Sequence, residues 1–351
     1  MNVRTSRRVV GLAVSAATLL SATLLSATPA HAAGGAYVAL GDSYSSGTGT
    51  RSYLDDGTAC QRSVYAYPSL IASSKGYTLN LRACSGATTA DVSNVQLQAL
   101  GPGTAYVSLS AGGNDAQFAS VLTECAKPAW LSNCNRAIDR AQSIITTQLP
   151  QRLQTLYSSI RARAPRARVV VVGYPKVFNG VDCDPLTWFS SAEQARLNAT
   201  GDVLNARIAS AASAAGFTFS NPTAAFAGHA VCDRTAWING LSLPLTNSYH
   251  PNRSGHASGY APLVGPSLSG ESLAVSSQAT RRAVASANRL AAQQRQYAAK
   301  DRTIEPERFL LPDLGSAASR AAAARAGVDL RSVATIDAAD KRVEAAQNRA
   351  R

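Results

Sequence analysis

Several signatures of common protein classes are missing from this chain of 351 residues. There is no Gly-x-Ser-x-Gly, which argues against the nucleophile elbow of the α/β-hydrolases. There is no glycine-rich phosphate loop and no Gly-x-Gly-x-x-Gly after a predicted strand, so nucleotide binding is not indicated. The sequence has no Cys-x-x-Cys and no histidine at ligand spacing, so a zinc site is not indicated. We therefore expect neither a metal nor a cofactor.

Long apolar runs are missing beyond the amino terminus. One run covers residues 9–25, three arginines precede it, and the small residues around 30–32 follow it. This order is typical of a secretory signal peptide, here residues 1–32. A membrane anchor fits less well, because the apolar run is short and ends close to the small-residue site. We expect a soluble, secreted, extracellular protein.

Acidic residues are outnumbered, with 21 Asp and Glu against 34 Lys and Arg and a formal charge of +13. The basic excess is spread along the chain, and no stripe of basic and aromatic residues indicates a nucleic-acid surface. We expect no nucleic-acid partner. A mild attraction to anionic lipid or cell-wall polymers is the expected consequence, with at most peripheral contact with lipid surfaces.

The six cysteines all follow the expected signal peptide: Cys60, Cys84, Cys125, Cys134, Cys183 and Cys232. In an exported protein an even number of cysteines indicates disulfides, here three. Six cysteines allow fifteen pairings, so the count alone does not select one. The short separation of Cys125 and Cys134 favours a local bridge between these two.

Apolar, β-branched runs predict buried parallel strands over residues 36–40, 78–81, 105–109 and 168–173, with 217–219 as a fifth. Helical patterns alternate with them over residues 64–72, 136–164, 190–215 and 251–264. Such alternation predicts a three-layer α/β domain, residues 33–268, around a parallel sheet of about five strands.

Local signals set the expected helix ends. Ser63 is a candidate N-cap, and Ser190 begins a capping box with Glu193. Pro150 is expected to kink or split the long helix in which it lies. Pro251 is expected in the first turn of the last helix of the domain.

Residues 269–351 have a different composition, rich in Ala, Arg, Ser and Gln and poor in large apolar residues. Helix propensity is high, but little apolar area is available for a core. We expect a loosely helical or disordered extension that does not share the core of the α/β domain. A small helical domain is the alternative.

Four blocks of small and polar residues carry the candidate chemistry: Gly41-Asp42-Ser43, Cys84-Ser-Gly-Ala-Thr88, Ala111-Gly-Gly-Asn-Asp115 and Ser248-Tyr-His-Pro-Asn252. Ser43 directly follows a predicted strand, at the sheet edge where ligands bind in open α/β folds. In content and order the blocks resemble the SGNH/GDSL hydrolases, a family of serine esterases and lipases. The resemblance is to secreted actinomycete (Streptomyces-type) lipases, esterases and phospholipases A1, and it covers roughly residues 36–266.

The resemblance implies a flavodoxin-like SGNH hydrolase fold and agrees with sequential disulfides, 60–84, 125–134 and 183–232. It implies an enzyme that cleaves carboxylic esters through an acyl-enzyme, with acyl esters or lipids as substrates. We expect a monomer. The relatives suggest a lipase or a phospholipase A1. Two alternatives stay open: a polysaccharide O-deacetylase of the same family, and a catalytically silent module that binds the cell envelope.

The resemblance makes Ser43 the nucleophile and His250 the base that takes and returns its proton. Two other histidines follow the expected signal peptide. His229 lies in a loop, where we expect it to shape the wall of the cleft. His256 falls inside a predicted helix, where a packed or solvated side chain is expected.

The oxyanion of the tetrahedral intermediate needs fixed hydrogen-bond donors. The resemblance assigns this role to the backbone N–H groups of Ser43 and Gly86 and to the side-chain amide of Asn114. Glycine at position 86 permits a close approach of substrate. For Asn114 the alternative is a helix N-cap.

The sequence departs from the common family pattern at the base. Many members have Asp-x-x-His, but the residue three before His250 is Asn247. We therefore expect a main-chain carbonyl, that of Ser248 or Asn247, to orient the imidazole. Asp42 is expected to brace its own turn, and Asp115 to support Asn114 or to cap a helix.

Overall fold

The structure is a computed structural model that describes residues 1–3, 5, 34–305 and 308–349. The expected signal peptide, residues 1–32, lies almost wholly outside the described residues. None of the helices within these ranges combines the length and the apolar composition that crossing a bilayer requires.

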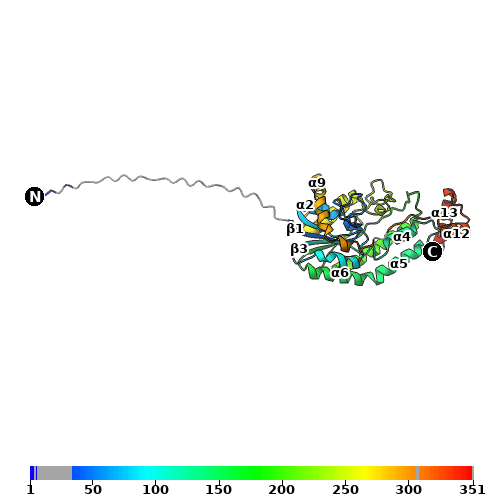
Figure 1. Cartoon of the computed structure of the whole chain (residues 1–351), viewed down its shortest axis with the longest axis horizontal. Helices are drawn as coiled ribbons and strands as arrows, with labels where there is room; N and C mark the ends of the chain where they lie inside the picture. The colour runs from blue at the N-terminus through cyan, green and yellow to red at the C-terminus, as the bar shows by residue number, and fades with distance from the viewer. Residues whose placement is uncertain (4, 6–33, 306–307, 350–351) are drawn as a thin grey trace. The chain divides into compact units, whose positions relative to one another are not determined.

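A five-stranded parallel sheet forms the centre of the fold (Figure 1), with strand order β2-β1-β3-β4-β5. The strands are β1 (Gly34–Gly41), β2 (Tyr77–Leu81), β3 (Thr104–Ser110), β4 (Arg168–Val172) and β5 (Thr218–Ser220). Val107 of β3 pairs with Val38 on one side and with Val169 on the other. All five predicted strands are present, and the order is the flavodoxin-like one.

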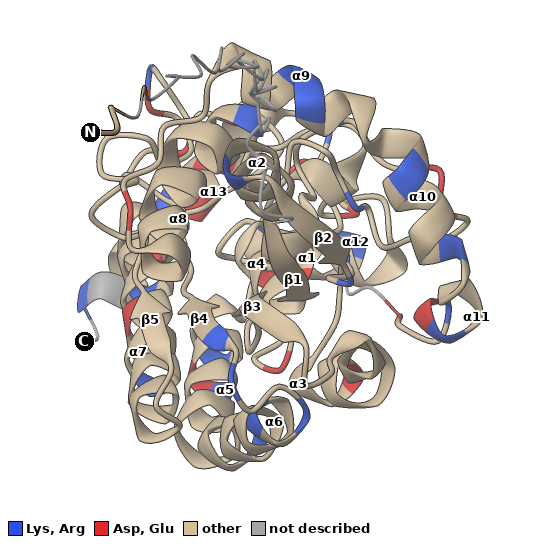
Figure 2. Cartoon of the chain, turned by 90° about the vertical axis from the view of Figure 1, so that its left-hand side faces the viewer, with Lys and Arg blue, Asp and Glu red and all other residues tan. Residues whose placement is uncertain are grey.

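Helices cover both faces of this sheet (Figure 2). One face carries α2 (Tyr67–Lys75), the π-helix η4 (Gly255–Tyr260) and α8 (Ala261–Ser269). The other carries α5 (Cys134–Thr147), α6 (Leu149–Arg163) and α7 (Ser191–Ala214), with α4 (Phe118–Cys125) packed on α5. The residues of β4 from Val169 to Val172 are consequently buried. The predicted three-layer α/β fold is confirmed.

Two predicted helix boundaries are confirmed. The long predicted helix is split into α5 and α6, and Pro150 lies in the first turn of α6, where its missing N–H costs nothing. Ser190 caps α7 through a capping box, in which its hydroxyl accepts from the N–H of Glu193 and the Glu193 carboxylate accepts from the N–H of Ser190.

Two other predicted helix ends are wrong. Ser63 does not cap α2; the N-cap is Ala66, while the Ser63 hydroxyl accepts from the N–H of Tyr65. Pro251 is not in a first helical turn but in an isolated β-bridge with Ile238. Ser63 also binds the Ser46 carbonyl and the Thr50 hydroxyl. In both cases the loop before the helix has partners elsewhere in the chain that local sequence signals do not report.

Six helical elements of the α/β domain have no counterpart in the sequence prediction: α4 and the shorter elements α1 (Ser43–Ser46), α3 (Thr89–Asp91), η1 (Val92–Gln96), η2 (Leu97–Ala99) and η3 (Leu245–Asn247). Three of them, α1, α3 and η3, lie within or beside the four polar blocks. The disulfides join Cys60 to Cys84, Cys125 to Cys134 and Cys183 to Cys232, which is the sequential pairing.

The C-terminal extension, residues 269–351, is largely helical where it is described. It contains α9 (Ser277–Ala285), α10 (Ala287–Arg295), α11 (Ala298–Asp301), α12 (Ala317–Ala326) and α13 (Val333–Arg349). Helix α9 packs on α2, and α10 packs beside the edge strand β2.

The expectation that this extension shares no core with the α/β domain is wrong. Several of its side chains belong to the main hydrophobic core: Leu273, Ala283, Leu290, Ile304 and Phe309. A smaller cluster around Ile336 contacts Trp130 and Trp188 of the α/β domain. The physical reason is that alanine-rich helix faces approach closely, so a few large side chains suffice.

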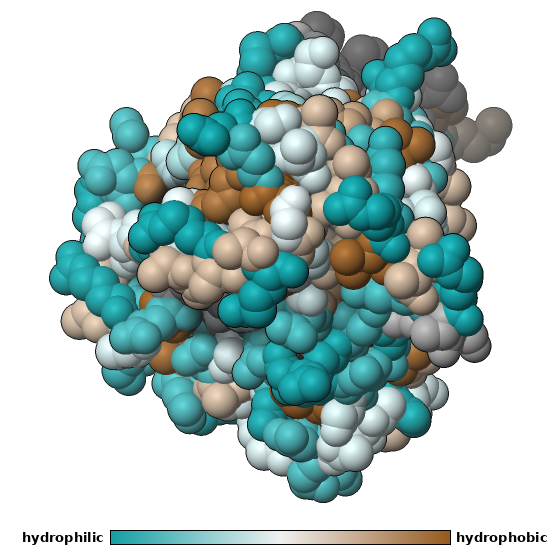
Figure 3. Space-filling view, turned by 90° about the vertical axis from the view of Figure 1, so that its right-hand side faces the viewer, coloured by the Kyte–Doolittle hydropathy of each residue, from teal (hydrophilic) through white to brown (hydrophobic). Residues whose placement is uncertain are grey.

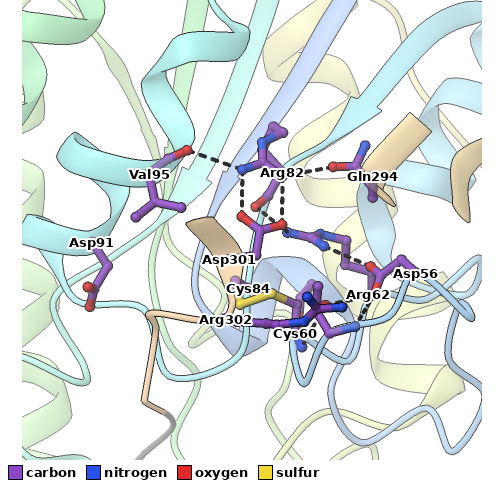
Figure 4. The surroundings of a disulfide bond; sticks show 12 residues. Asp56, Cys60, Arg62, Arg82, Cys84, Asp91, Val95, Gln294, Asp301 and Arg302 are labelled. Atoms are coloured by element: carbon purple, nitrogen blue, oxygen red, sulfur yellow. Dashed lines mark hydrogen bonds and ion pairs between the residues drawn. A yellow bond between two sulfur atoms is a disulfide. The ribbon is translucent and has the colours of Figure 1, made fainter. Parts of the chain in front are cut away.

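Buried charge also joins the extension to the domain. The carboxylate of Asp301 accepts hydrogen bonds from Arg62 at 2.7 Å and from Arg82 at 2.7 and 2.9 Å. Both arginines are buried, with 1% and 0% exposure, and Asp56 pairs with Arg62 at 2.7 Å. Figure 4 shows both guanidinium groups directed at Asp301, beside the Cys60–Cys84 disulfide. Burial lowers the pKa of Arg82, and Asp301 opposes this shift.

We predict that Asp301→Asn strongly destabilises the fold. Removing one partner of a buried ion pair typically costs about 3–5 kcal/mol, because the remaining charge stays buried without compensation. At roughly 2 °C per kcal/mol, Tm should fall by about 6–10 °C in a thermal melt. Asp329→Asn is the matched control, since Asp329 pairs with Arg331 at an exposed site and its loss should leave Tm unchanged. Equal Tm values for the two variants would contradict the prediction.

Candidate active site

Ser43 lies at the carboxyl end of β1, after a sharp bend at Gly41. Gly41 has φ +114°, and a Cβ there would come within 2.2 Å of the Ser110 carbonyl oxygen. Gln96 holds this bend, because its side chain accepts from Gly41 N at 2.7 Å and donates to Gly41 O at 2.8 Å. The chain then turns directly into α1, of which Ser43 is the first residue.

Asp42 braces this turn, as expected. Its carboxylate accepts from the N–H of Tyr44 at 3.0 Å, from the Ser110 hydroxyl at 2.5 Å and from the Tyr174 hydroxyl at 2.5 Å. Burial raises the pKa of Asp42 to about 6, although these donors act in the opposite direction. The three donors come from α1, β3 and the loop after β4, so Asp42 joins the three segments around Ser43.

The structure brings Ser43 and His250 together across 207 residues of sequence. The Ser43 hydroxyl oxygen lies 2.9 Å from Nε2 of His250, and Nδ1 lies 2.8 Å from the carbonyl oxygen of Ser248. Because a carbonyl oxygen only accepts, Nδ1 must carry the hydrogen. In the neutral ring, Nε2 is then the acceptor, with its lone pair available to the Ser43 hydroxyl.

Of the two carbonyls expected beside the imidazole, the structure places that of Ser248 there and not that of Asn247. The Asn247 carbonyl accepts from the side-chain amide of Asn239 at 3.2 Å. The side chain of Asn247 accepts a hydrogen bond from the Tyr53 hydroxyl. Asn247 is therefore a buried structural residue of the loop, and of the two alternatives only the Ser248 carbonyl lies at Nδ1 of His250 among the described residues.

Contacts that the sequence did not indicate hold the loop that carries His250. Tyr249 is buried with φ +59°, a left-handed conformation that is costly for a bulky residue. The Tyr44 hydroxyl donates to the Tyr249 carbonyl at 2.9 Å, and Asn239 donates its backbone and side-chain N–H groups to the His250 carbonyl at 2.9 and 3.1 Å. Asn239 lies outside all four polar blocks, so no sequence signal pointed to it.

The environment of His250 keeps its imidazole neutral. Protein encloses the ring apart from the edge that faces the cavity, and this burial lowers the pKa of His250 to about 4. The hydrogen bond to the Ser248 carbonyl raises the pKa but only partly offsets the burial. At neutral pH the ring is therefore unprotonated and able to accept a proton.

The other two histidines lie away from Ser43. His229 stacks on Trp237 with ring centroids 3.6 Å apart, and its Nδ1 is 2.7 Å from the Thr235 carbonyl oxygen. His256 is fully buried in η4, where Nδ1 accepts from the N–H of Tyr67 at 3.3 Å. Neither lines the cavity at Ser43, so His229 does not shape the cleft wall and His256 is a packed helical residue.

The three expected oxyanion donors border one cavity together with His250. Within the described part of the chain, the backbone N–H groups of Ser43 and Gly86 have no hydrogen-bond acceptor. Gly86 has φ +85°, which favours glycine at this close approach. One N–H of the Asn114 amide donates to the Ala87 carbonyl at 2.9 Å, which leaves the second without a described partner.

Neither Asn114 nor Asp115 is the N-cap of the following helix α4, because the N-cap residue of α4 is Gln117. Asp115 accepts from the N–H and the hydroxyl of Thr89 at 2.9 and 2.7 Å, at the start of α3, and from Arg152 at 3.3 Å. The carboxylate of Asp115 thus fixes α3, as one of the two expected roles foresaw, and does not contact Asn114.

The cavity beside Ser43 has a volume of about 290 Å³, close to the lower end of the range for ligand pockets. Its polar side contains Ser43, His250 and Asn114. Its apolar side is built from α4, α5 and α7, with Phe118, Val121, Leu122, Ile145, Leu197 and Leu204. An acyl chain attached to a reacting carbonyl at Ser43 would meet this apolar side. Within the described ranges, no cluster of three acidic, histidine or cysteine side chains could hold a metal ion.

The chain is similar to known lipases in sequence and in structure. The model of the GDSL-like lipase/acylhydrolase family matches residues 39–258. A lipase of Streptomyces rimosus is 43% identical over 230 residues, which are 65% of this chain and 85% of that protein. Lipase 1 of Streptomyces coelicolor is 41% identical over 256 residues, which are 72% of this chain and 93% of that protein.

Solved structures agree. The extracellular lipase from Streptomyces rimosus has a TM-score of 0.63 at 41% identity, over 66% of this chain and 99% of that one. The phospholipase A1 from Streptomyces albidoflavus has a TM-score of 0.63 at 38% identity, over 67% of this chain and 100% of that one. The chain belongs to the GDSL-like lipase/acylhydrolase family, which has the SGNH hydrolase fold. It is a carboxylic ester hydrolase of the lipase and esterase type.

We predict an acid limb of kcat/KM at about pH 4. Only neutral His250 can accept a proton, so activity should rise as pH increases through its lowered pKa and then stay level towards neutral pH. An ordinary histidine would place the limb near pH 6.5. The measurement is a pH series of kcat/KM on a soluble ester, with a thermal melt at each pH to show that the protein stays folded.

Asp42→Asn serves as the control for this profile, because the Asp42 carboxyl titrates at about pH 6 beside Ser43. An inflection near pH 6 that disappears in this variant belongs to Asp42. A single acid limb near pH 6.5 that persists in the variant would contradict a lowered pKa of His250.

Proposed function

We propose that the protein is a secreted serine ester hydrolase that acts through an acyl-enzyme on Ser43, with His250 as general base. The observation that carries the proposal is the 2.9 Å contact between the Ser43 hydroxyl and Nε2 of His250, whose Nδ1 is held by the Ser248 carbonyl. The catalytic residues then all lie in the α/β domain, residues 33–268. The N-terminal signal pattern and the extracellular lipase relative support secretion.

Acylation is the first half of the reaction. His250 takes the proton of the Ser43 hydroxyl while its oxygen attacks the ester carbonyl carbon. The carbonyl oxygen becomes negatively charged and is met by the N–H groups of Ser43 and Gly86 and by the Asn114 amide. The tetrahedral intermediate then loses the alcohol, which receives the proton from His250, and the acyl group stays on Ser43.

Deacylation repeats these steps with water. His250 takes a proton from a water molecule, which attacks the acyl-enzyme, and returns that proton to the Ser43 oxygen as the fatty acid leaves. A neutral carbonyl at Nδ1 fixes the tautomer but stabilises imidazolium less than a carboxylate does. The protein therefore works with a Ser–His pair in which orientation is supplied by the main chain.

The apolar cavity supports acyl esters of lipids as the substrate class. Triacylglycerols and the acyl chains of phospholipids both present a long apolar chain next to an ester carbonyl. The relatives named lipase and phospholipase A1 agree with this class. A polysaccharide O-deacetylase would transfer only an acetyl group, which leaves most of the apolar side unused, and no feature of the site favours that alternative.

Contact with a lipid surface would be peripheral. On the face drawn in Figure 3, apolar residues lie in several small patches between hydrophilic ones. Leu243 is 77% exposed and lies two residues from Leu245, which lines the cavity. A single exposed apolar side chain near the cavity can touch a lipid surface without anchoring the protein in it. We propose a monomer without a nucleic-acid partner.

The decisive test is covalent labelling. A serine-directed phosphonate should modify the purified protein once, at Ser43, and abolish hydrolysis of a chromogenic ester. Ser43→Ala should lose activity by a factor on the order of 10⁶ in kcat. Ser45→Ala is a neighbouring control for the labelling site. Stoichiometric labelling at another serine, or full activity of Ser43→Ala, would refute the proposal. A wild-type protein that is folded but inactive and unlabelled would also refute it, in favour of the silent binding module.

We also predict that Asn114→Ala lowers kcat about 10²–10³-fold with little change in KM, because an oxyanion donor acts in the transition state and not on the bound ester. Steady-state kinetics on a soluble ester measure both parameters. Asp115→Asn is the comparison: it changes the neighbouring residue, which supports α3, and should affect Tm more than kcat. A rise in KM at constant kcat for Asn114→Ala would contradict the assignment.

A further inference from the structure

We propose that Phe309 of the C-terminal extension is a specificity-determining residue of the active site, and that it sets the preference for long acyl chains. The proposal rests on the proposed function, because it assigns the selectivity of the cavity in which Ser43 would react. It concerns a segment that lies beyond residue 258, where the match to the family ends.

Phe309 belongs to the wall of the catalytic cavity. Its side chain is 5% exposed, and it borders the same space as Ser43 and His250. Its ring contacts the ring of Tyr249 edge to face, with centroids 5.0 Å apart. Tyr249 directly precedes His250, so the extension reaches the loop that carries the base.

The next residue binds helix α4, which supplies another side of the cavity. The N–H of Leu310 donates to the Thr123 hydroxyl at 2.9 Å, and Thr123 belongs to α4. Helix α4 supplies Phe118, Val121 and Leu122 to the apolar lining. Phe309 and Leu310 together therefore connect α4 to the His250 loop, the two parts of the fold between which the cavity lies.

Fixed points on both sides hold this position. On the N-terminal side, Asp301 is buried between Arg62 and Arg82. On the C-terminal side, Asp340 accepts from the N–H of Ala129 at 2.6 Å, and Asp337 accepts from the indole N–H of Trp188 at 3.0 Å. The extension is thus tied to the α/β domain both before and after Phe309.

The chemistry of the ring fits an acyl chain. Phe309 adds a large apolar surface to a cavity whose apolar side already consists of aliphatic and aromatic residues. Apolar contact grows with each methylene that is buried, so a long chain gains from this wall and a short chain gains less. The solved Streptomyces lipase is matched over 99% of its length by 66% of this chain, and Phe309 lies beyond residue 258, where the family match ends.

The test compares kcat/KM for p-nitrophenyl laurate and p-nitrophenyl butyrate in the same detergent solution, using the full chain. Phe309→Ala should lower the laurate-to-butyrate ratio about tenfold, because the lost surface serves the long chain. Phe309→Leu keeps part of the apolar surface and should give an intermediate ratio. Leu310→Ala is the matched control: the side chain of Leu310 is 57% exposed and does not line the cavity, so the ratio should not change.

Thermal melts and phosphonate labelling accompany each variant to show a folded protein with a reactive serine. A ratio for folded Phe309→Ala within about twofold of the wild type would overturn the proposal. If Phe309→Ala does not fold, an unchanged ratio for Phe309→Leu overturns it equally. The Ser43→Ala variant separates the two proposals: activity in Ser43→Ala refutes the proposed function, whereas an inactive Ser43→Ala with an unchanged ratio in the Phe309 variants refutes only this inference.

Discussion

The hydrogen bond from Nδ1 of His250 to the Ser248 carbonyl is the interaction on which the site depends. It decides which imidazole nitrogen carries the hydrogen, and therefore whether Nε2 can accept from Ser43. The two partners are residues i and i+2, and the residue between them is Tyr249. Tyr249 adopts a left-handed conformation, and aromatic packing and the hydrogen bonds from Tyr44 and Asn239 to the loop hold it. The Ser248 carbonyl thus takes the place that a buried carboxylate has in a triad, and the fold accepts one strained residue, Tyr249.

The absence of a carboxylate beside the described imidazole has an electrostatic consequence. A buried carboxylate at Nδ1 would raise the pKa of His250 by stabilising the imidazolium. With a neutral carbonyl in its place, burial dominates and the pKa falls to about 4. The nearby acid Asp42 does not compensate, because its carboxylate is directed at Ser110 and Tyr174. The imidazole of His250 is thus neutral over a wide pH range, and it is a weaker base than an ordinary histidine.

The sequence predicted what is encoded in contiguous residues. The β-branched run Val169–Val172 indicated a buried strand, Pro150 indicated the split between α5 and α6, and the motif around Ser43 indicated the edge of the sheet. Contacts between distant segments were not predictable in this way. Asn239 has no local signature, and the pairs of Asp301 with Arg82 and Arg62 span 219 and 239 residues. The prediction that the extension shares no core was wrong because it rested on the number of large apolar residues. The extension is attached instead through close alanine contacts and through a buried carboxylate.

The residue that anchors the extension, Arg82, and the proposed oxyanion residue Gly86 lie in one short stretch of chain. Arg82, which binds Asp301, lies two residues before Cys84 and four before Gly86, and backbone N–H groups of this stretch bind Ala39 and Gly41 at the end of β1. A buried ion pair adds little net stability over an apolar one, but leaving one partner alone is costly. Removing the extension would therefore leave Arg62 and Arg82 without the carboxylate of Asp301, which would destabilise the fold. The extension therefore meets the surroundings of the site at two places, at the stretch that leads to Gly86 and at the cavity wall that contains Phe309.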